Sequence, residues 1–258
     1  MTRIISIVNE KGGSGKTTTA VSLGAFLAKL GKRVLLIDLD PQANATISLG
    51  FSPRKIPTNI YHALMGEVPL KDVIKKTPLF NFDIAPSNSD LAGGNIELLD
   101  KMGREQILSK IIETVKNDYD YILLDPPPSL GILTLNALVA AREIIVPIQC
   151  EFFALKSLEQ LFEILDLLEK NLNKSFHNFF GLLTMYDKRN MLAREILKEV
   201  QEKFPGKVFE TIIPRNIKLA EAPKYGKTIF QYAPESTGAK AYEMLAEEII
   251  LENSKSKA

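Results

Sequence analysis

The chain of 258 residues is poor in the residues on which disulfide-rich and metal-rich proteins depend. It has no tryptophan and a single cysteine, Cys150. One cysteine excludes a disulfide within the chain and any site that needs four cysteine ligands. It also argues against an iron–sulfur carrier or an electron-donating reductase, since those need several cysteines, and we expect Cys150 to be a small buried residue. Such cysteine usage fits a reducing compartment, so we expect a cytoplasmic protein.

Long apolar runs and an excess of charge of one sign are missing too. No segment approaches 18 consecutive apolar residues, so we expect no transmembrane helix. The first strand pattern, "RIISIV", begins at Arg3, so we expect no signal peptide. The 32 basic and 31 acidic residues give a net charge of only +1. Any binding of nucleic acid would therefore need a local basic patch.

Strand and helix patterns alternate through most of the sequence. The strand candidates are continuous apolar runs, as expected for parallel strands that are buried on both faces. The predicted strands are Ile4–Val8, Arg33–Asp38, Tyr121–Asp125, Glu143–Ile148, Gly181–Tyr186 and Phe209–Pro214. The predicted helices are Lys16–Leu30, Arg104–Lys116, Leu133–Ala141, Leu155–Asn171, Leu192–Lys203 and Gly238–Leu251.

This alternation predicts an α/β fold, a doubly wound and mostly parallel sheet with helices on both faces. We find no internal repeat and no linker, so we expect one domain over residues 1–252, followed by a polar tail over residues 253–258. The least regular stretch, Pro53 to Pro78, is expected to hold one or two peripheral helices with loops.

The segment "NEKGGSGKTTT" (Asn9 to Thr19) has the ending of a phosphate-binding loop, G-x-x-x-x-G-K-[ST]. Its glycines let the backbone approach phosphate oxygens, and the helix that follows offers its positive end. We expect ATP with Mg²⁺, with Lys16 on the β- and γ-phosphates and the Thr17 hydroxyl on the metal. The expected nucleotide contacts are Gly12, Gly13, Ser14, Gly15, Lys16, Thr17 and Thr18.

Three aspartates follow predicted strands and are expected near the phosphates. Asp125 ends the run "YILLD" and is the candidate second metal-holding acid of a P-loop enzyme. Asp38 and Asp40 lie two residues apart in "LLIDLDPQAN", so they point to the same side. We expect their strand to lie beside the first strand. Asp40 would orient the attacking water, and Asp38 would serve the outer shell of the metal or Lys16.

A second cation, Lys11, lies where the loop begins, next to Glu10, which stands in the place of the usual first glycine. At the rim, its side chain is poorly placed to curl back onto its own phosphates. It is better placed to reach a nucleotide on a facing subunit, as an arginine finger does in trans. We therefore expect the contact between Lys11 and a nucleotide to depend on dimer formation.

Together these segments resemble a known family. "KGGSGKTTTA" is similar to the deviant Walker A motif of the MinD/ParA class of P-loop ATPases. The segments "DLDPQANAT", "DPPPSLGILTLNAL", "PIQCEFFALKSLEQL", "LLTMYDKR" and "TIIPRNIKLAEAPKYGKTI" resemble the ParA/Soj branch, which segregates chromosomes and plasmids. The resemblance runs from about Ile4 to Ala246. It departs at Pro126, where relatives commonly have cysteine, and at Lys218, where arginine is usual.

The resemblance implies a set of roles and partners. Members form ATP-sandwich dimers in which the lysine matching Lys11 contacts the partner's nucleotide, and the acid matching Asp40 supports hydrolysis. Met185, Pro214 and Asn216 would flank the adenine. The ATP-bound dimer of such proteins binds double-stranded DNA without sequence preference on the nucleoid. A ParB-type centromere-binding protein then stimulates slow hydrolysis and releases the dimer.

The sequence carries charge that suits such DNA binding. Basic residues outnumber acidic ones between Lys203 and Lys240, and Lys188 and Arg189 would add to them if the strand ends converge. Contacts of this kind to phosphates give non-specific, salt-dependent affinity. No extra N-terminal helix-turn-helix is expected, so neither is operator binding. The candidate DNA-binding residues are Arg189, Lys218, Lys224 and Lys227.

Two alternatives stay within the same class. A MinD-like ATPase would bind membrane through a basic amphipathic C-terminal helix, whereas this chain ends in the acidic helix pattern "AYEMLAEEIILENSKSKA". We therefore expect no membrane partner. A ParA-like ATPase that positions another cargo would have the same motifs, and the sequence does not separate it from a partition ATPase.

Overall fold

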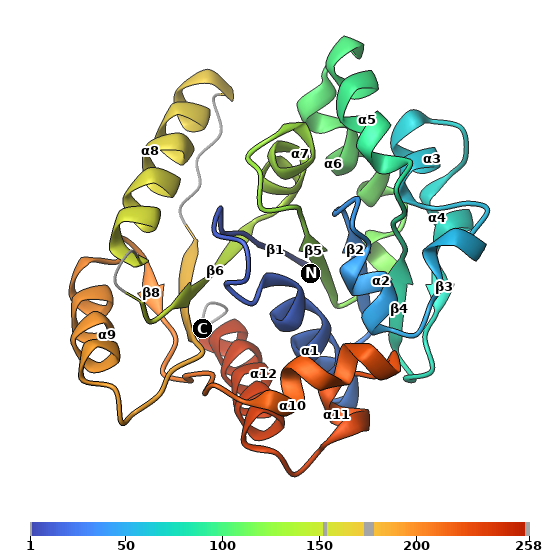
Figure 1. Cartoon of the computed structure of the whole chain (residues 1–258). Coiled ribbons are helices and arrows are strands. Elements are labelled where there is room, and N and C mark those ends of the chain that lie inside the picture. The colour runs from blue at the N-terminus through green and yellow to red at the C-terminus, as the bar shows by residue number, and fades with distance from the viewer. Residues whose placement is uncertain (1, 152–153, 173–177, 256–258) are drawn as a thin grey trace.

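One β-sheet organises the chain. The computed structural model describes residues 2–151, 154–172 and 178–255. Within these residues, eight strands form a sheet in the order β3-β4-β2-β5-β1-β6-β7-β8 (Figure 1). The strands are β1 (Arg3–Ile7), β2 (Val34–Asp38), β3 (Lys75–Lys76), β4 (Phe82–Ala85), β5 (Tyr121–Asp125), β6 (Glu143–Gln149), β7 (Phe179–Thr184) and β8 (Lys207–Val208).

Helices connect the strands. The α-helices are α1 (Lys16–Lys29), α2 (Asn44–Ser48), α3 (Ile60–Met65), α4 (Leu70–Val73), α5 (Leu91–Glu97), α6 (Ile107–Glu113), α7 (Ile132–Ala140), α8 (Ala154–Leu172), α9 (Met191–Lys203), α10 (Ile217–Glu221), α11 (Ile229–Tyr232) and α12 (Thr237–Lys255). The 3₁₀ helices are η1 (Pro53–Lys55), η2 (Leu98–Asp100), η3 (Arg104–Gln106), η4 (Lys116–Asp118) and η5 (Ala222–Tyr225).

The first strand lies in the middle of the sheet. Ser6 of β1 is opposite Leu124 of β5 on one side and Ile144 of β6 on the other. Every strand pair is parallel except β3 with β4. The doubly wound, mostly parallel fold is thus confirmed. The prediction that β2 lies beside β1 is wrong, because β5 lies between them.

Helices cover both faces of the sheet. Side chains alternate along β1, so Ile5 and Ile7 face a core shared with α1 and α12, whereas Ile4 faces a core shared with α6 and α7. Helices α8 and α9 pack over β6 and β7 in a third cluster. Figure 1 shows α1 and α12 side by side, and the Thr19 and Tyr242 hydroxyls between them lie 2.9 Å apart.

One predicted strand is wrong. Residues 209–214 run beside β7, and the amides of Phe209 and Ile213 donate to the carbonyls of Gly181 and Leu183, each at 2.9 Å, but the segment forms an isolated bridge, between Pro214 and Tyr186, and no named strand. Between these contacts, the amides of Glu210 and Thr211 donate to the carboxylate of Glu248 on α12 at 2.9 and 3.0 Å. A side chain therefore takes the place of a neighbouring strand, which the local sequence does not reveal.

Element bounds otherwise follow the predictions closely. The helix predicted over residues 104–116 is divided into η3 and α6, while the other predicted helices begin within one residue of their expected starts. Between Pro53 and Pro78 lie η1, α3, α4 and the short strand β3. β3, β4 and β8 were not predicted as strands. Helix α12 continues to Lys255, past the predicted end at Leu251, and residues 256–258 of the expected tail lie outside the described part.

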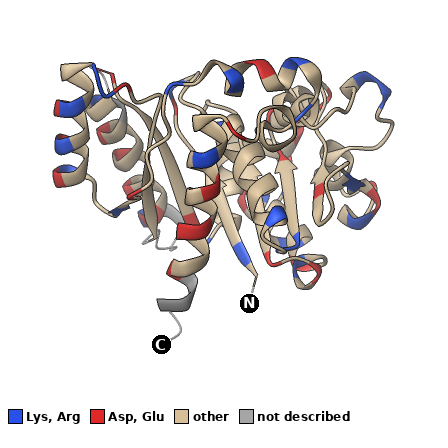
Figure 2. Cartoon of the chain, turned by 90° about the horizontal axis from the view of Figure 1, so that it is seen from below, with Lys and Arg blue, Asp and Glu red and all other residues tan. Residues whose placement is uncertain are grey.

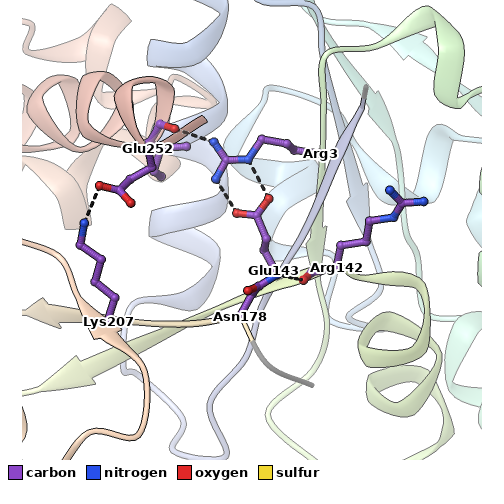
Figure 3. A network of polar contacts seen from close by, with 7 residues as sticks. Arg3, Arg142, Glu143, Asn178, Lys207 and Glu252 are labelled. Atoms are coloured by element: carbon purple, nitrogen blue, oxygen red, sulfur yellow. Dashed lines mark hydrogen bonds and ion pairs between the residues drawn. The ribbon is translucent and has the colours of Figure 1, made fainter. Parts of the chain in front are cut away.

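A polar network fastens α12 to the amino-terminal edge of the sheet (Figure 3). Arg3 of β1 forms an ion pair with Glu143 of β6 and donates a hydrogen bond to the carbonyl of Ile249 on α12. Lys207, at the start of β8, pairs with Glu252 of the same helix. These contacts, together with the buried Tyr242, tie the carboxyl-terminal helix to the central strands.

Candidate functional site

A cleft of about 590 Å³ opens at the carboxyl ends of β1, β2 and β5. The order of the strands reverses around β1 here, and ligands of doubly wound sheets bind at such a switch point. The cleft also contains residues that the sequence did not single out, among them Gln42, Asn44 and Pro223. The predicted site residues in its lining are Gly12, Gly13, Gly15, Lys16, Thr17, Thr18, Asp40 and Met185.

The loop between β1 and α1 has the shape of a phosphate cradle. Gly13 and Gly15 adopt left-handed backbone conformations, with φ of 79° and 96°, which side chains disfavour. A Cβ at Gly12 or Gly13 would meet nothing within 4 Å, so this side of the loop is open. Ser14 is fully buried instead, and its carbonyl accepts a hydrogen bond from the Thr184 hydroxyl at 2.9 Å. The contact fixes the loop to the end of β7.

Lys16 lies inside the cleft with only 7% of its surface exposed. Burial lowers its pKa, and the charges of Asp125 and Asp40 partly offset that effect. Its ammonium donates a hydrogen bond of 3.4 Å to the carbonyl of Lys11, a long contact that leaves donors for another acceptor. A buried cation with spare donors at the start of a helix is suited to hold a phosphate.

Asp125 and Asp38 face each other at the ends of β5 and β2, where they are direct neighbours in register. Both are fully buried. Burial, and then the charge of Asp38, raise the pKa of Asp125 well above its ordinary value, while the Thr17 hydroxyl and Lys16 act in the opposite direction. Apart from the neighbouring Thr17 hydroxyl, neither carboxylate oxygen of Asp125 has a hydrogen-bond partner among the described residues.

Asp38 is better satisfied than Asp125. Its carboxylate accepts hydrogen bonds from the amide and hydroxyl of Thr46, at 2.8 and 2.7 Å, and from the amide of Asp40 at 3.2 Å. Burial nevertheless raises its pKa to about 7. Thr46 is thus a supporting residue that the sequence did not indicate, because its contact arises only when the chain turns back after β2.

These oxygens fit a magnesium ion. Buried carboxylate oxygens without partners are costly unless something pairs with them, and Mg²⁺ takes oxygen ligands. Thr17 and Asp125 supply such oxygens next to the phosphate cradle. Asp38 is held by Thr46, and its place in the outer shell of the metal stays a prediction.

Asp40 is fixed in a tight turn with its carboxylate at the cleft. Its carbonyl accepts hydrogen bonds from the Ala43 amide and the Ser87 hydroxyl, both at 2.8 Å. One carboxylate oxygen accepts from the Gln42 amide at 2.9 Å. Asp40 itself lines the cleft, so a carboxylate held in this turn borders the space that the phosphates would occupy.

Lys11 does not point into its own cleft. Its ammonium lies 2.6 Å from a carboxylate oxygen of Glu151, just after β6. Its backbone amide donates to the side chain of Asn9 at 2.9 Å. Lys16 thus lies in the lining of the cleft, whereas Lys11 is held outside that lining by Glu151, and the dimer-dependent role of Lys11 stays a prediction.

A second cavity, of about 260 Å³, adjoins the loop and brings the three adenine candidates together. Met185, Pro214 and Asn216 all line it, with Gly15 and Thr18 on the cradle side. Met185 has a φ of 52°, which is strained for a residue with a side chain. Strained backbone of this kind is concentrated at ligand sites.

The DNA-binding candidates lie on segments that follow this cavity. The bridge between Tyr186 and Pro214 places the loop that carries Arg189 beside the segment that leads to Lys218. The strand ends therefore converge. Arg189 pairs with Asp187 and lowers the pKa of that carboxyl to about 2, and Lys218 pairs with Glu221. Lys224 and Lys227 are exposed.

The basic excess is divided in space. Lys207 pairs with Glu252 near the far end of α12, whereas Lys240 pairs with Glu235 at the start of that helix, which packs against α10. Figure 2 shows basic and acidic residues interspersed over the helices in that view. Any basic surface is therefore a small one made by the segments around α10 and η5.

The comparisons with known proteins agree with this site. A family model described as an AAA domain matches residues 2–178. The sporulation initiation inhibitor protein Soj of Bacillus subtilis is 47% identical over 249 residues, which covers 96% of this chain and 98% of that protein. The chromosome-partitioning ATPase Soj of Treponema pallidum is 46% identical over 250 residues, covering 97% and 98%.

A solved structure gives the same fold with a nucleotide. The Mycobacterium smegmatis protein named cobyrinic acid a,c-diamide synthase, with bound ADP and magnesium, has a TM-score of 0.86 and 36% identity, and the match covers 100% of this chain and 97% of that one. The chain has the cradle, the buried lysine and the acids for the same ligands. It is an ATPase that uses ATP and Mg²⁺, and it belongs to the Soj/ParA family of P-loop ATPases.

Proposed function

We propose that the protein is a ParA-type partition ATPase for chromosomes or plasmids. Two ATP-bound subunits close over their nucleotides, and the dimer then binds double-stranded DNA on the nucleoid without sequence preference. A ParB-type centromere-binding protein stimulates hydrolysis and so releases the dimer into the cytoplasm. The relatives with partition names, at 46 and 47% identity over nearly their whole length, support this proposal.

The chemistry follows from the cleft. The loop amides and Lys16 bind the phosphates of ATP, and the buried position of Lys16 strengthens that attraction because little water screens it. Thr17 and Asp125 would hold Mg²⁺, which would neutralise phosphate charge when bound. Asp40 orients the attacking water by accepting a hydrogen bond from it. Asp38 keeps the Asp40 turn in place through its contacts with Thr46 and the Asp40 amide.

Lys11 completes the site from the other subunit. To reach a partner's nucleotide it must exchange Glu151 for a phosphate. This contact is partly exposed, so breaking it costs little, on the order of 1 kcal/mol or less. Dimer closure then supplies positive charge near the leaving phosphate, as an arginine finger does.

One observation carries the DNA part of the proposal. The segments that line the nucleotide cavities also carry the basic candidates: Met185 precedes Arg189, and Asn216 precedes Lys218. On the other side of the cleft, Pro223 in its lining is followed by Lys224. A nucleotide that fixes the positions of these segments would at the same time fix the positions of the cations on their outer side.

The test is binding of a random-sequence DNA duplex without nucleotide, with ADP–Mg²⁺ and with ATP–Mg²⁺, across a salt series. We expect binding with ATP only, falling steeply with salt because phosphate contacts release counterions. Absence of binding in all three states would overturn the partition mechanism.

The MinD-like alternative has less support. The apolar side of α12, with Tyr242, Leu245 and Ile249, is buried in the core next to α1, so it is not free to enter a bilayer. Among the described residues, no helix combines the length and apolarity of a membrane span. A ParA-like role with another cargo shares every feature of the proposed cycle except the partner protein.

A further inference from the structure

Two helical turns meet beside the nucleotide cleft, and at their point of nearest approach the backbones of two glycines face each other. Gly50 ends the α2 turn with a φ of 86°, and Gly226 ends η5 with a φ of 59°. A Cβ on Gly226 would lie 2.7 Å from the Cα of Gly50, and a Cβ on Gly50 would lie 3.1 Å from the Gly226 carbonyl oxygen. A side chain at Gly226 would therefore force the two turns apart, and one at Gly50 would do so to a smaller degree.

The α2 side of this contact is tied to the phosphate end of the cleft. Asn44 and Ser48 line the cleft, and the helix begins directly after the Asp40 turn. Thr46 bonds to the buried Asp38 through both its amide and its hydroxyl. Any displacement of the Asp40 turn therefore moves α2 as a unit.

The η5 side carries two of the candidate DNA-binding cations. Pro223 lines the cleft, whereas Lys224 and Lys227 on either side of Gly226 are exposed. The turn is closed by hydrogen bonds from the Gly226 amide to Pro223 at 3.0 Å and from the Lys227 amide to Ala222 at 3.3 Å. The position of η5 thus fixes where both lysines lie.

We propose that the Gly50–Gly226 contact is the positioning contact that couples the phosphate end of the cleft to the DNA-binding surface. The inference rests on the proposed function and adds to it the route of its ATP dependence. Backbone against backbone has no side-chain rotamers to absorb a shift, so a movement of α2 is passed to η5 with little loss. The ligand of the positioned surface is the phosphate backbone of duplex DNA.

The test compares Gly50→Ala and Gly226→Ala with Gly31→Ala and Gly66→Ala. The control glycines have φ of 80° and 82°, and a Cβ on them meets nothing within 4 Å. All four substitutions therefore introduce similar backbone strain, but only the first two disturb the contact. For each variant, ATP affinity, thermal unfolding and duplex binding with ATP and with ADP are measured.

We expect the ratio of DNA affinity with ATP to that with ADP to fall about fivefold or more in Gly50→Ala and Gly226→Ala, within the usual range of coupling between sites. Their ATP affinity should stay within about twofold of the parent, and the controls should keep the parental ratio. The salt slope of the remaining binding should be unchanged, because no phosphate contact has been removed.

The outcomes distinguish a failure of the proposed function from a failure of the inference alone. A parent protein that binds no DNA with ATP overturns the proposed function and the inference with it. A parent that binds only with ATP, together with glycine variants that keep the full ratio, overturns the inference alone. If Gly226→Ala fails to fold, the milder Gly50→Ala decides. If Gly50→Ala and Gly226→Ala both lost ATP binding while the control variants stayed folded, the role of the contact would be to stabilise the fold. That result would also overturn the inference.

Discussion

At the scale of single residues, the site separates two lysines by burial. Lys16 is 7% exposed and lies among Asp125 and Asp40, whereas Lys11 is directed to the rim and held by Glu151. The first is therefore ready for a phosphate within the same chain. The second is held by a contact that a competing anion can replace. Both side chains have the same chemistry, so this difference comes from where the backbone of each lysine lies in the loop.

Asp40→Ala should stop turnover without removing the nucleotide. We expect the hydrolysis rate to fall about 10²- to 10⁴-fold, the usual contribution of a group that positions or deprotonates the nucleophile. ATP affinity should change little, since the phosphate donors remain. Phosphate release and equilibrium nucleotide binding measure the two effects. Hydrolysis at the parental rate would contradict the role of Asp40.

The sequence singled out candidate site residues that stand in a recognisable local pattern. The loop from Gly12 to Thr18 lies between a strand and a helix, and Asp38 and Asp125 end the apolar runs of β2 and β5. Glu151 could not be found in this way, since it meets Lys11 across 140 residues. A local sequence pattern does not indicate a contact that forms only because of the order of the strands in the sheet.

At the scale of elements, the same reason explains the errors in the fold. The central strands were predicted because burial on both faces makes them continuous apolar runs, and the helices because burial on one side gives them a helical period. β3 and β8, with two residues each, are too short to carry a period. The segment 209–214 carries an apolar pattern like that of a strand, but Glu248 takes the hydrogen bonds of two of its amides. The place of β2 depends on β5, which is almost ninety residues later.

Helix α12 should act as a core element. Leu245 is fully buried between α12 and the sheet, whereas its neighbour Met244 is 58% exposed. We expect Leu245→Ala to lower the free energy of unfolding by about 2–5 kcal/mol. Met244→Ala, the matched control, should change it by less than about 0.5 kcal/mol. Urea denaturation measures both, and equal effects would contradict the packing of this helix.

The turn η5 gives a prediction for DNA binding. Lys224 is exposed and forms no ion pair within the described part of the chain, whereas Lys218 pairs with Glu221. Lys224→Ala should weaken ATP-dependent DNA binding and lower the salt slope by about 1, as expected for one lost phosphate contact. Lys71→Ala, an exposed lysine on α4, removes the same charge elsewhere. If both variants gave the same slope, η5 would not be part of the interface.

At the scale of the whole molecule, buried acids make stability depend on pH. Burial raises the pKa of Asp38 to about 7 and acts in the same direction on Asp125. Between about pH 4, where an unfolded aspartate titrates, and pH 7, the folded protein therefore binds more protons than the unfolded chain. Stability from this source is present at lower pH and is lost as pH rises through 7.

The nucleotide-free protein should accordingly be more stable at pH 6 than at pH 8. A single group with a folded pKa near 7 gives a difference of about 1 kcal/mol over this range. Asp38→Asn should reduce the difference. Urea denaturation at the two pH values in the presence of a chelator measures it, and greater stability at pH 8 would contradict the assignment.

The central place of β1 has a consequence for the order in which the protein is made. β1 precedes all of its partners along the chain, since Arg3 pairs with Tyr121 and Ile5 with Glu143, and α1, which follows β1, packs against Tyr242. The phosphate loop therefore emerges long before the strands and the helix that give it its shape. Contacts so distant along the chain slow folding. A nascent chain therefore gains the full shape of this loop only after β5, β6 and α12 have been made, so ATP can stabilise the chain from that point on and none of its earlier intermediates.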